Sequence, residues 1–376
     1  MKIRENQFYL CNTYMQLITA IQIKKYIYPN EKGTLLLSDH SVNADKVIQR
    51  MTSLGIFDDV IAADTKFYEF EQSKYEDFKD VMTLTLGLKN KYSREFLCSD
   101  CIYDRIFFHN YDFILYPLLE QCWNRGKVPA LCRMEEGISS YANMIRKELE
   151  TPSTRMKAIH KLRGFFKKPT LDGNMHDFFV FFPTLFPPTE KKVHGIPLLS
   201  CEDKDLVNIF DTIFDYHPEK DPYPEKYIFM GSCRNIDGAS TRETEIILKL
   251  AELVGPENLL VKMHPRDGRH VYEEKGIHVS RNSSVPWEVI QLSHDFSNHV
   301  ILTVSSSSAI TASALLCDNV ETFLLYPMDT GLDNEYDKFC EESLGGLLKK
   351  LQLQGLCLNH HVTGNLEDIV NVEDKH

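Results

Sequence analysis

Long apolar runs are missing from this sequence. No stretch of about 18 apolar residues occurs, so we predict no membrane-spanning helix. The N-terminus passes from charged residues directly into a strand-like run at Phe8–Cys11, and we expect no signal peptide. The ten cysteines are scattered and form no disulfide framework, which favours a reducing compartment. We therefore expect a cytoplasmic protein, peripheral at most at the cytoplasmic face of the membrane.

Several chemical signatures are also absent. No G-x-S-x-G nucleophile motif occurs, which disfavours a serine hydrolase. The only D-x-D, at Asp203–Asp205, follows Glu202 and is interpreted as an exposed helix start rather than a metal site. The lone C-x-x-C of Cys98 and Cys101 is a weak metal signal without a second pair. A net charge of -12 repels phosphate backbones, so we expect no nucleic-acid partner.

Length and patterning predict two domains. The chain has 376 residues, about twice the usual size of one domain. Two series of short apolar runs alternate with helical patterns, which predicts an α/β fold with two parallel sheets. We place the first domain at 1–195, with a basic connector at about 150–195, and the second at 196–376. The expected strands are Gln7–Asn12, Gly33–Ser38, Val60–Ala63, Arg105–His109, Val128–Met134, Tyr227–Met230, Leu259–Met263, Val300–Val304 and Thr322–Tyr326.

Three of these strands end in polar residues. Glu135, Glu136 and Gly137 follow one strand, His264 and Pro265 follow another, and Ser305–Ser308 follow a third. Ligands of an open parallel sheet bind outside the carboxyl ends of its strands. The sequence therefore predicts an active site at these ends.

The serine run precedes a predicted helix that starts at Ala309. A helix N-terminus exposes unpaired N–H groups and partial positive charge, and serine hydroxyls there can bind phosphate oxygens. The alternative is plain helix capping, for which one serine is enough.

His264, Glu135 and Glu136 are candidates for acid–base chemistry. The imidazole of His264, with Lys262 two positions before it, can protonate or hydrogen-bond a leaving phosphate. A second His-Pro dipeptide, His217-Pro218, follows no strand. Either glutamate can act as a general base, because like charge and partial burial raise the pKa of one carboxylate. Gly137 permits a turn with positive φ.

Taken together, these motifs resemble those of the bacterial sialyltransferases with the GT-B fold. Those enzymes share a D/E-D/E-G motif, an H-P motif and a Ser/Thr-rich motif, as at Glu135–Gly137, His264-Pro265 and Ser305–Ser308. Cys11–Gln16 is similar to the N-terminal signature C-x-T-P-x-Q of glycosyltransferase family 52, the lipooligosaccharide and capsule sialyltransferases. Tyr14 stands where that family has proline. The resemblance covers about residues 7–330.

The resemblance implies a GT-B fold, two Rossmann-like domains with parallel sheets facing a central cleft. It implies that sialic acid moves, with inversion, from CMP-sialic acid to a galactose-type hydroxyl of a surface glycan. No metal or other cofactor would be needed, and the enzyme would be a homodimer. His264 would assist departure of the CMP phosphate. The residues implied on the nucleotide are Ser305, Ser306, Ser307, Glu288, Gly231, Ser232, Lys262 and Pro265, and those implied on the sugar and acceptor side are Asn12, Thr13, Gln16 and Gly137.

Three questions stay open at this point. The acceptor could be deprotonated by Asp237, which we favour slightly, or by Glu135 or Glu136. The basic segment Arg155–Lys168 could bind an anionic membrane surface or a lipid-linked glycan, pack between subunits, or be an ordinary exposed helix. The protein could also be a GT-B transferase with another nucleotide donor, or a glycan-binding protein without catalytic activity.

Overall fold

The computed structural model describes residues 5–38, 41–63, 102–110, 114–141, 154–232, 234 and 238–371. The chain divides into two units. Unit 1 comprises Met1–Glu136 and Asn143–Pro197, and unit 2 comprises Gly137–Ala142 and Leu198–His376. The chain thus leaves unit 1 directly after Glu136, contributes six residues to unit 2 and returns. Among the described helices, none has both the length and the apolar composition needed to cross a membrane.

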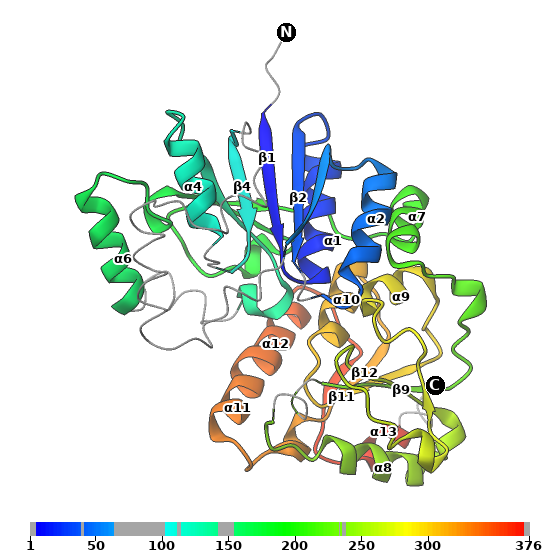
Figure 1. Ribbon diagram of the computed structural model, residues 1–376. Helices are drawn as coiled ribbons and strands as arrows, with labels where there is room; N and C mark the ends of the chain where they lie inside the picture. The colour runs from blue at the N-terminus through cyan, green and yellow to red at the C-terminus, as the bar shows by residue number, and fades with distance from the viewer. Residues whose placement is uncertain are drawn as a thin grey trace. The chain divides into compact units, whose positions relative to one another are not determined.

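The described part of unit 1 contains a seven-stranded parallel sheet in the order β3-β2-β1-β4-β5-β6-β7 (Figure 1). Its strands are β1 (Asn6–Cys11), β2 (Lys32–Ser38), β3 (Asp59–Ala63), β4 (Arg105–Phe108), β5 (Ala130–Met134), β6 (Met175–Val180) and β7 (Lys192–Gly195). Its helices are α1 (Tyr14–Gln22, followed by a π-helical turn at Ile23–Ile27), α2 (Ala44–Leu54), α4 (Leu115–Trp123) and α6 (Thr154–Phe165).

Alternating side chains of β1 pack on opposite faces of this sheet, as the period of two along a strand requires. Phe8 and Leu10 belong to a buried cluster that includes Leu118 and Leu119 of α4. On the other face, Tyr9 stacks on Phe107 with ring centroids 4.7 Å apart. Because both faces are covered, these strands are nearly continuous apolar runs, which made them recognisable in the sequence.

Two strands correct the prediction of a connector at 150–195. Residues of this segment form β6 and β7, which extend the sheet beyond β5. Phe178 and Phe179 of β6 are both buried, so the aromatic run is part of the core of unit 1. The chain passes into unit 2 at Leu198.

Unit 2 contains a six-stranded parallel sheet in the order β10-β9-β8-β11-β12-β13 among its described residues. Its strands are β8 (Tyr227–Met230), β9 (Leu259–Lys262), β10 (His278–Val279), β11 (Val300–Thr303), β12 (Glu321–Leu324) and β13 (His360–Val362). Its α-helices are α7 (Lys204–Phe214), α8 (Glu243–Val254), α9 (Trp287–Ser293), α10 (Ser308–Leu316), α11 (Asn334–Phe339), α12 (Gly346–Gln352) and α13 (Glu367–Val370).

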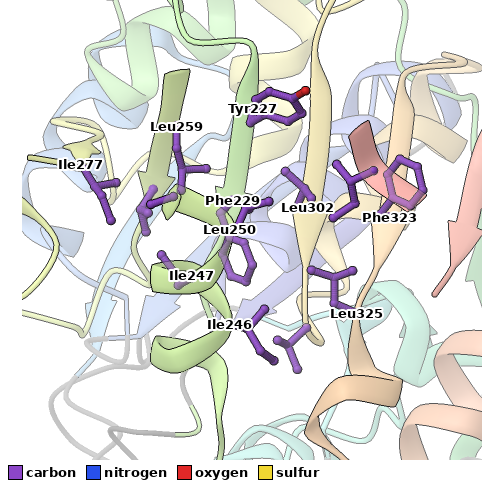
Figure 2. Close-up of a cluster of buried hydrophobic side chains, with 14 of the residues drawn as sticks. Tyr227, Phe229, Ile246, Ile247, Leu250, Leu259, Ile277, Leu302, Phe323 and Leu325 are labelled. Carbon is purple, nitrogen blue, oxygen red and sulfur yellow. The ribbon is translucent and has the colours of Figure 1, made fainter. Parts of the chain in front are cut away.

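Helix α8 covers one face of the second sheet. Figure 2 shows Ile246, Ile247 and Leu250 of this helix beside Phe229 of β8 and Leu302 of β11, in one buried cluster. Elsewhere in unit 2, Asp203 caps α7 by accepting a hydrogen bond from the Leu206 N–H at 3.0 Å. The interpretation of the D-x-D as a helix start is therefore confirmed.

The two sheets share one topological feature. In each, the first strand lies inside the sheet, the next two strands of the unit add to one side, and the later strands add to the other. The strand order therefore switches between β1 and β4 in unit 1 and between β8 and β11 in unit 2. Ligands of open α/β sheets bind outside the carboxyl ends of the strands at such switch points.

Candidate functional site

The carboxyl ends of β8 and β9, beside the switch point of unit 2, bring together Gly231, Lys262 and His264. The Gly231 N–H donates to the carbonyl of Lys262 at 2.9 Å. A Cβ added at Gly231 would lie 3.6 Å from the backbone nitrogen of His264. The ends of β8 and β9 are therefore in contact. The end of β11 lies on the other side of β8, and since neighbouring strands are about 4.8 Å apart, β9 and β11 end about 10 Å from each other.

Thr303 fixes the serine loop to the end of β8. Its buried hydroxyl donates to the carbonyl of Met230 at 2.9 Å. The same oxygen accepts hydrogen bonds from the backbone N–H groups of Ser305 at 3.2 Å and Ser306 at 2.8 Å. One side chain thus determines the path of the loop on the side of β8 opposite to His264.

The serine hydroxyls do not cap helix α10. Ser307 occupies the N-cap position without a side-chain capping hydrogen bond. Within the part of the chain that the structure describes, the hydroxyls of Ser306 and Ser307 make no hydrogen bond, and both residues are partly exposed. The first N–H groups of a helix and nearby hydroxyls can together bind an anion.

His264 is partly exposed at the end of β9. Its Nδ1 faces the backbone N–H of Arg266 at 3.3 Å. A backbone N–H only donates, so Nδ1 accepts, and the proton of the neutral ring is on Nε2. Exposed Pro265 follows, and the chain turns so that the Asp267 N–H reaches the His264 carbonyl at 2.8 Å. This turn presents an Nε2–H donor.

Lys262 and Glu288 are buried ionisable side chains that interact electrostatically near the same edge. Burial lowers the pKa of Lys262 to about 8, whereas the nearby Glu288 and Asp221 favour its charged form. Its ammonium donates to the Ser283 carbonyl at 3.0 Å. Burial raises the pKa of Glu288, opposed mainly by hydrogen bonds and by Lys262. The Thr311 hydroxyl of α10 donates to Glu288 at 3.1 Å, so this carboxylate lies at the first turns of the helix that follows the serine loop.

The loop after β8 is held by buried acids. The Ser232 N–H lies 3.1 Å from both carboxylate oxygens of Glu243, whose pKa is raised by burial. The guanidinium of Arg234 donates to buried Asp329 at 3.0 Å and lies 3.2 Å from the ring centroid of Tyr336. Asp237, the other candidate base, lies outside the described residues.

Gly137 belongs to unit 2, although Glu136 before it belongs to unit 1. Its φ is 56°, in the left-handed region that the sequence predicts for it. A Cβ at Gly137 would lie 3.4 Å from Cγ2 of Thr311. The glycine therefore permits both the turn and the close packing on α10.

In unit 1, the N-terminal signature has a structural explanation at the switch point between β1 and β4. Thr13 caps α1 by accepting from the Gln16 N–H at 3.2 Å. The side-chain oxygen of buried Gln16 accepts from the Asn12 N–H at 2.7 Å. Its Nε2 donates to Glu136 at 2.8 Å. Asn12, Thr13 and Gln16 thus fix one another and orient a carboxylate.

The same carboxylate faces His109, which follows β4. Nδ1 of buried His109 lies 3.0 Å from the Met134 carbonyl oxygen and therefore carries a proton. Its Nε2 lies 3.3 Å from Oε2 of Glu136. The ring of His109 thus lies between two oxygen atoms, with its Nδ1–H on the Met134 carbonyl and its Nε2 beside the Glu136 carboxylate.

Glu135 has a different environment from its neighbour. Its buried carboxylate accepts from the Phe181 N–H at 2.6 Å, beyond the end of β6. Its backbone N–H donates to Phe179 and its carbonyl accepts from Thr19. Glu135 therefore joins β5, β6 and α1, and Glu136 is the glutamate at the switch point.

Sequence reasoning missed three residues at these edges: His109, Thr303 and Arg234. Each follows or ends a strand at its carboxyl end, so the rule that selected His264 could have found them.

Among the described residues, no group of three His, Cys, Asp or Glu side chains is arranged to hold a metal ion. Cys98 and Cys101 lie outside the described residues.

Comparison with known proteins identifies the fold. No protein-family model and no curated protein sequence matches the chain. An α/β-galactoside α-2,3-sialyltransferase from Photobacterium phosphoreum is structurally similar, with a TM-score of 0.51 and 12% identity over 98% of this chain and 100% of that one. The fold is GT-B, with two Rossmann-like units.

Two further structures are similar at lower scores. The glycosyltransferase VinC in complex with dTDP has a TM-score of 0.49 and 8% identity over 98% of this chain and 90% of that one. The UDP-GlcNAc 2-epimerase of Methanocaldococcus jannaschii has a TM-score of 0.48 and 12% identity, over 98% of this chain and 92% of the epimerase. At these identities the similarity is one of fold.

Proposed function

We propose that this protein is an inverting sialyltransferase that uses CMP-sialic acid as its donor. The observation that supports this proposal is the placement of two groups suited to a phosphate beside β8, with His264 on one side and the serine loop on the other. A monophosphate needs fewer donors than a pyrophosphate, and the Ser305–Ser308 loop offers hydroxyls and helix N–H groups with no Lys or Arg beside it in the sequence. The resemblance to family 52 supports the same donor.

The nucleotide would occupy the carboxyl edge of unit 2. Ser305 and Ser306 would bind the phosphate, with Ser307 beside them. Glu288, whose carboxylate is already oriented by Thr311, would accept hydrogen bonds from the ribose hydroxyls. Gly231 and Ser232 would place backbone groups near the base, since a side chain at Gly231 would fill the space beside the His264 backbone. Buried Lys262 would favour the charged form of Glu288 against the effect of burial.

The reaction would be a single displacement. The acceptor hydroxyl oxygen forms a bond to the anomeric carbon of sialic acid as the bond from that carbon to the phosphate oxygen breaks. The electron pair leaves on CMP, and the Nε2–H of His264 hydrogen-bonds the departing phosphate. The acceptor proton passes to a carboxylate, for which the contacts of Glu136 with Gln16 and His109 provide support. Asp237 is the alternative base.

The acceptor would be a terminal galactose of a bacterial lipooligosaccharide or capsule. Asn12, Thr13, Gln16 and Gly137 would support the acceptor and sugar side by fixing the position of Glu136 and of the turn after it. As part of the same proposal, the enzyme is a cytoplasmic homodimer that needs no metal. Light scattering would test the dimer, and activity in the presence of EDTA would test the independence from metal.

A donor screen tests the proposal. The purified chain is incubated with a galactose-terminated acceptor and, separately, CMP-sialic acid, UDP-galactose, UDP-N-acetylglucosamine and dTDP-glucose. We expect acceptor-dependent release of CMP and transfer of sialic acid alone. Consumption of another donor would contradict the assigned donor, and acceptor-independent binding of glycans without turnover would contradict catalysis.

A further inference from the structure

The end of helix α6 exposes two adjacent aromatic rings. Phe165 is 81% exposed and Phe166 is 47% exposed, and their ring centroids lie 5.2 Å apart in an edge-to-face arrangement. Among the described residues, they are the only two consecutive large hydrophobic side chains that are exposed. Water solvates such a pair poorly, and exposed apolar patches mark interaction surfaces.

Exposed lysines surround these rings. Lys157, Lys161 and Phe165 are spaced four residues apart and therefore share one face of α6. Both lysines are exposed, as is Lys167 directly after the two phenylalanines. We call Lys157, Lys161, Phe165, Phe166 and Lys167 the α6 surface.

A buried ion pair fixes the direction in which this surface points. Arg163 is fully buried, and its guanidinium lies 3.2 Å from Glu120 of α4 and over the ring of Tyr116. Lys168 also pairs with Glu120, at 2.5 Å. The remaining described cations of the segment face outward, and Figure 1 shows α6 at the margin of unit 1.

Charge distinguishes the α6 surface from the rest of the chain. Residues 151–171 contain six Lys or Arg and no Asp or Glu, in a protein with net charge -12. Glu120 offsets only the inward cations. A local positive charge beside exposed aromatic rings complements an anionic lipid interface, where rings enter the headgroup boundary and lysines meet phosphates.

We propose that the α6 surface docks on an anionic lipid bilayer, with Phe165 and Phe166 inserted at the headgroup boundary. Lys157, Lys161 and Lys167 contact lipid phosphates. This role is independent of the donor and of the reaction proposed above. This docking holds the protein at the membrane through α6, which lies along the surface of the bilayer.

Vesicle sedimentation of the full chain tests this proposal. Vesicles of phosphatidylcholine alone are compared with vesicles that contain about 30% phosphatidylglycerol, at about 0.1 M and about 0.5 M salt. We expect binding to the anionic vesicles that weakens with salt. Equal binding to both compositions would overturn the proposal, as would the absence of binding.

Matched variants assign the binding to the α6 surface. Phe165→Ser with Phe166→Ser, or Lys157→Gln with Lys161→Gln and Lys167→Gln, should each weaken binding about tenfold or more. Leu358→Ser, at a side chain that is 54% exposed in unit 2, and Lys191→Gln with Lys192→Gln should change it less than about twofold. Equal losses in the test and control variants would contradict the assignment.

A fluorescent variant distinguishes insertion from purely electrostatic adsorption. Phe165→Trp places a reporter on the exposed ring position, and its emission should shift to shorter wavelength on anionic vesicles. An unshifted emission together with equally strong binding to a soluble polyanion such as heparin would show that the surface recognises charge alone, and would overturn the lipid assignment.

Discussion

The polar side chains at the carboxyl edges of the two sheets differ in how many hydrogen bonds they make to one another. In unit 1, Asn12, Gln16, His109 and Glu136 bond to one another and are largely withdrawn from solvent. In unit 2, Thr303 fixes the backbone of the serine loop, whereas the hydroxyls of partly exposed Ser306 and Ser307 make no hydrogen bond among the described residues.

This difference predicts different responses to mutation. A network whose members orient each other is organised before a substrate arrives, so removing one member disturbs the others. A loop held by its backbone keeps its path when a hydroxyl is removed, so only ligand binding suffers. Variants of the two edges can therefore separate the two kinds of site.

The largest effect is expected at His264. His264→Ala should lower kcat by about 10²–10⁴-fold, since it removes the Nε2–H donor from the leaving phosphate, and should alter CMP affinity much less. The matched control is His217→Ala in the other His-Pro dipeptide, an exposed position that should leave kcat unchanged. Steady-state kinetics and CMP titration measure both; an active His264→Ala variant would remove this histidine from the reaction.

Substitutions of the two neighbouring glutamates should have different effects, one on the rate of the reaction and the other on the stability of the fold. Glu136→Gln should lower kcat by about 10²-fold, because an amide cannot accept the acceptor's proton. Glu135→Gln should instead lower the free energy of unfolding by about 1–3 kcal/mol, because Phe181 loses a charged acceptor in a buried site. Denaturant unfolding and kinetics compare them, with Asp237→Asn as the third variant. If Asp237→Asn lowers kcat by about 10²-fold and Glu136→Gln does not, the base is Asp237.

His360 should give unit 2 a specific pH dependence. Burial lowers the pKa of His360 to about 4, and its Nε2 lies 3.3 Å from the Ala309 carbonyl in the first turn of α10. Between about pH 6.5 and pH 4 the unfolded chain binds this proton and the folded chain does not, so stability falls as the pH falls. The loss should reach about 3 kcal/mol relative to His360→Gln. Parallel unfolding curves of the two proteins across this range would contradict the assignment.

The smallest effects are expected in the serine loop. Ser306→Ala and Ser307→Ala should each weaken CMP binding by roughly threefold to tenfold, the value of one hydrogen bond. Their melting temperatures should match the wild type, because neither hydroxyl caps α10. Ser297→Ala, in an exposed loop of the same unit, serves as the control. A loss of stability without a loss of affinity would make the serines structural.

The sequence predicted the strands that carry the site because buried parallel strands are continuous apolar runs. Leu259–Met263 and Val300–Val304 were each predicted one residue too long at the carboxyl end. β6 and β7 were missed, since β7 is a polar edge strand and the aromatic run before it lacked a helical or alternating period.

The partners of the site residues could not be read from the chain. His109 ended a predicted strand, but its pairing with Glu136 depends on β4 and β5 lying side by side. Glu135 and Glu136 are adjacent and chemically alike, and only the position of β6 separates a structural carboxylate from one at the switch point. Local pattern predicts elements, whereas sheet order decides which side chains meet.

Calorimetric titration of the full chain with CMP and with cytidine tests the central claim most directly. If the serine loop and His264 bind a monophosphate, CMP should bind at least about tenfold more tightly than cytidine, and Ser305→Ala with Ser306→Ala should remove most of that difference. Equal affinities for CMP and cytidine in the wild type would contradict the account.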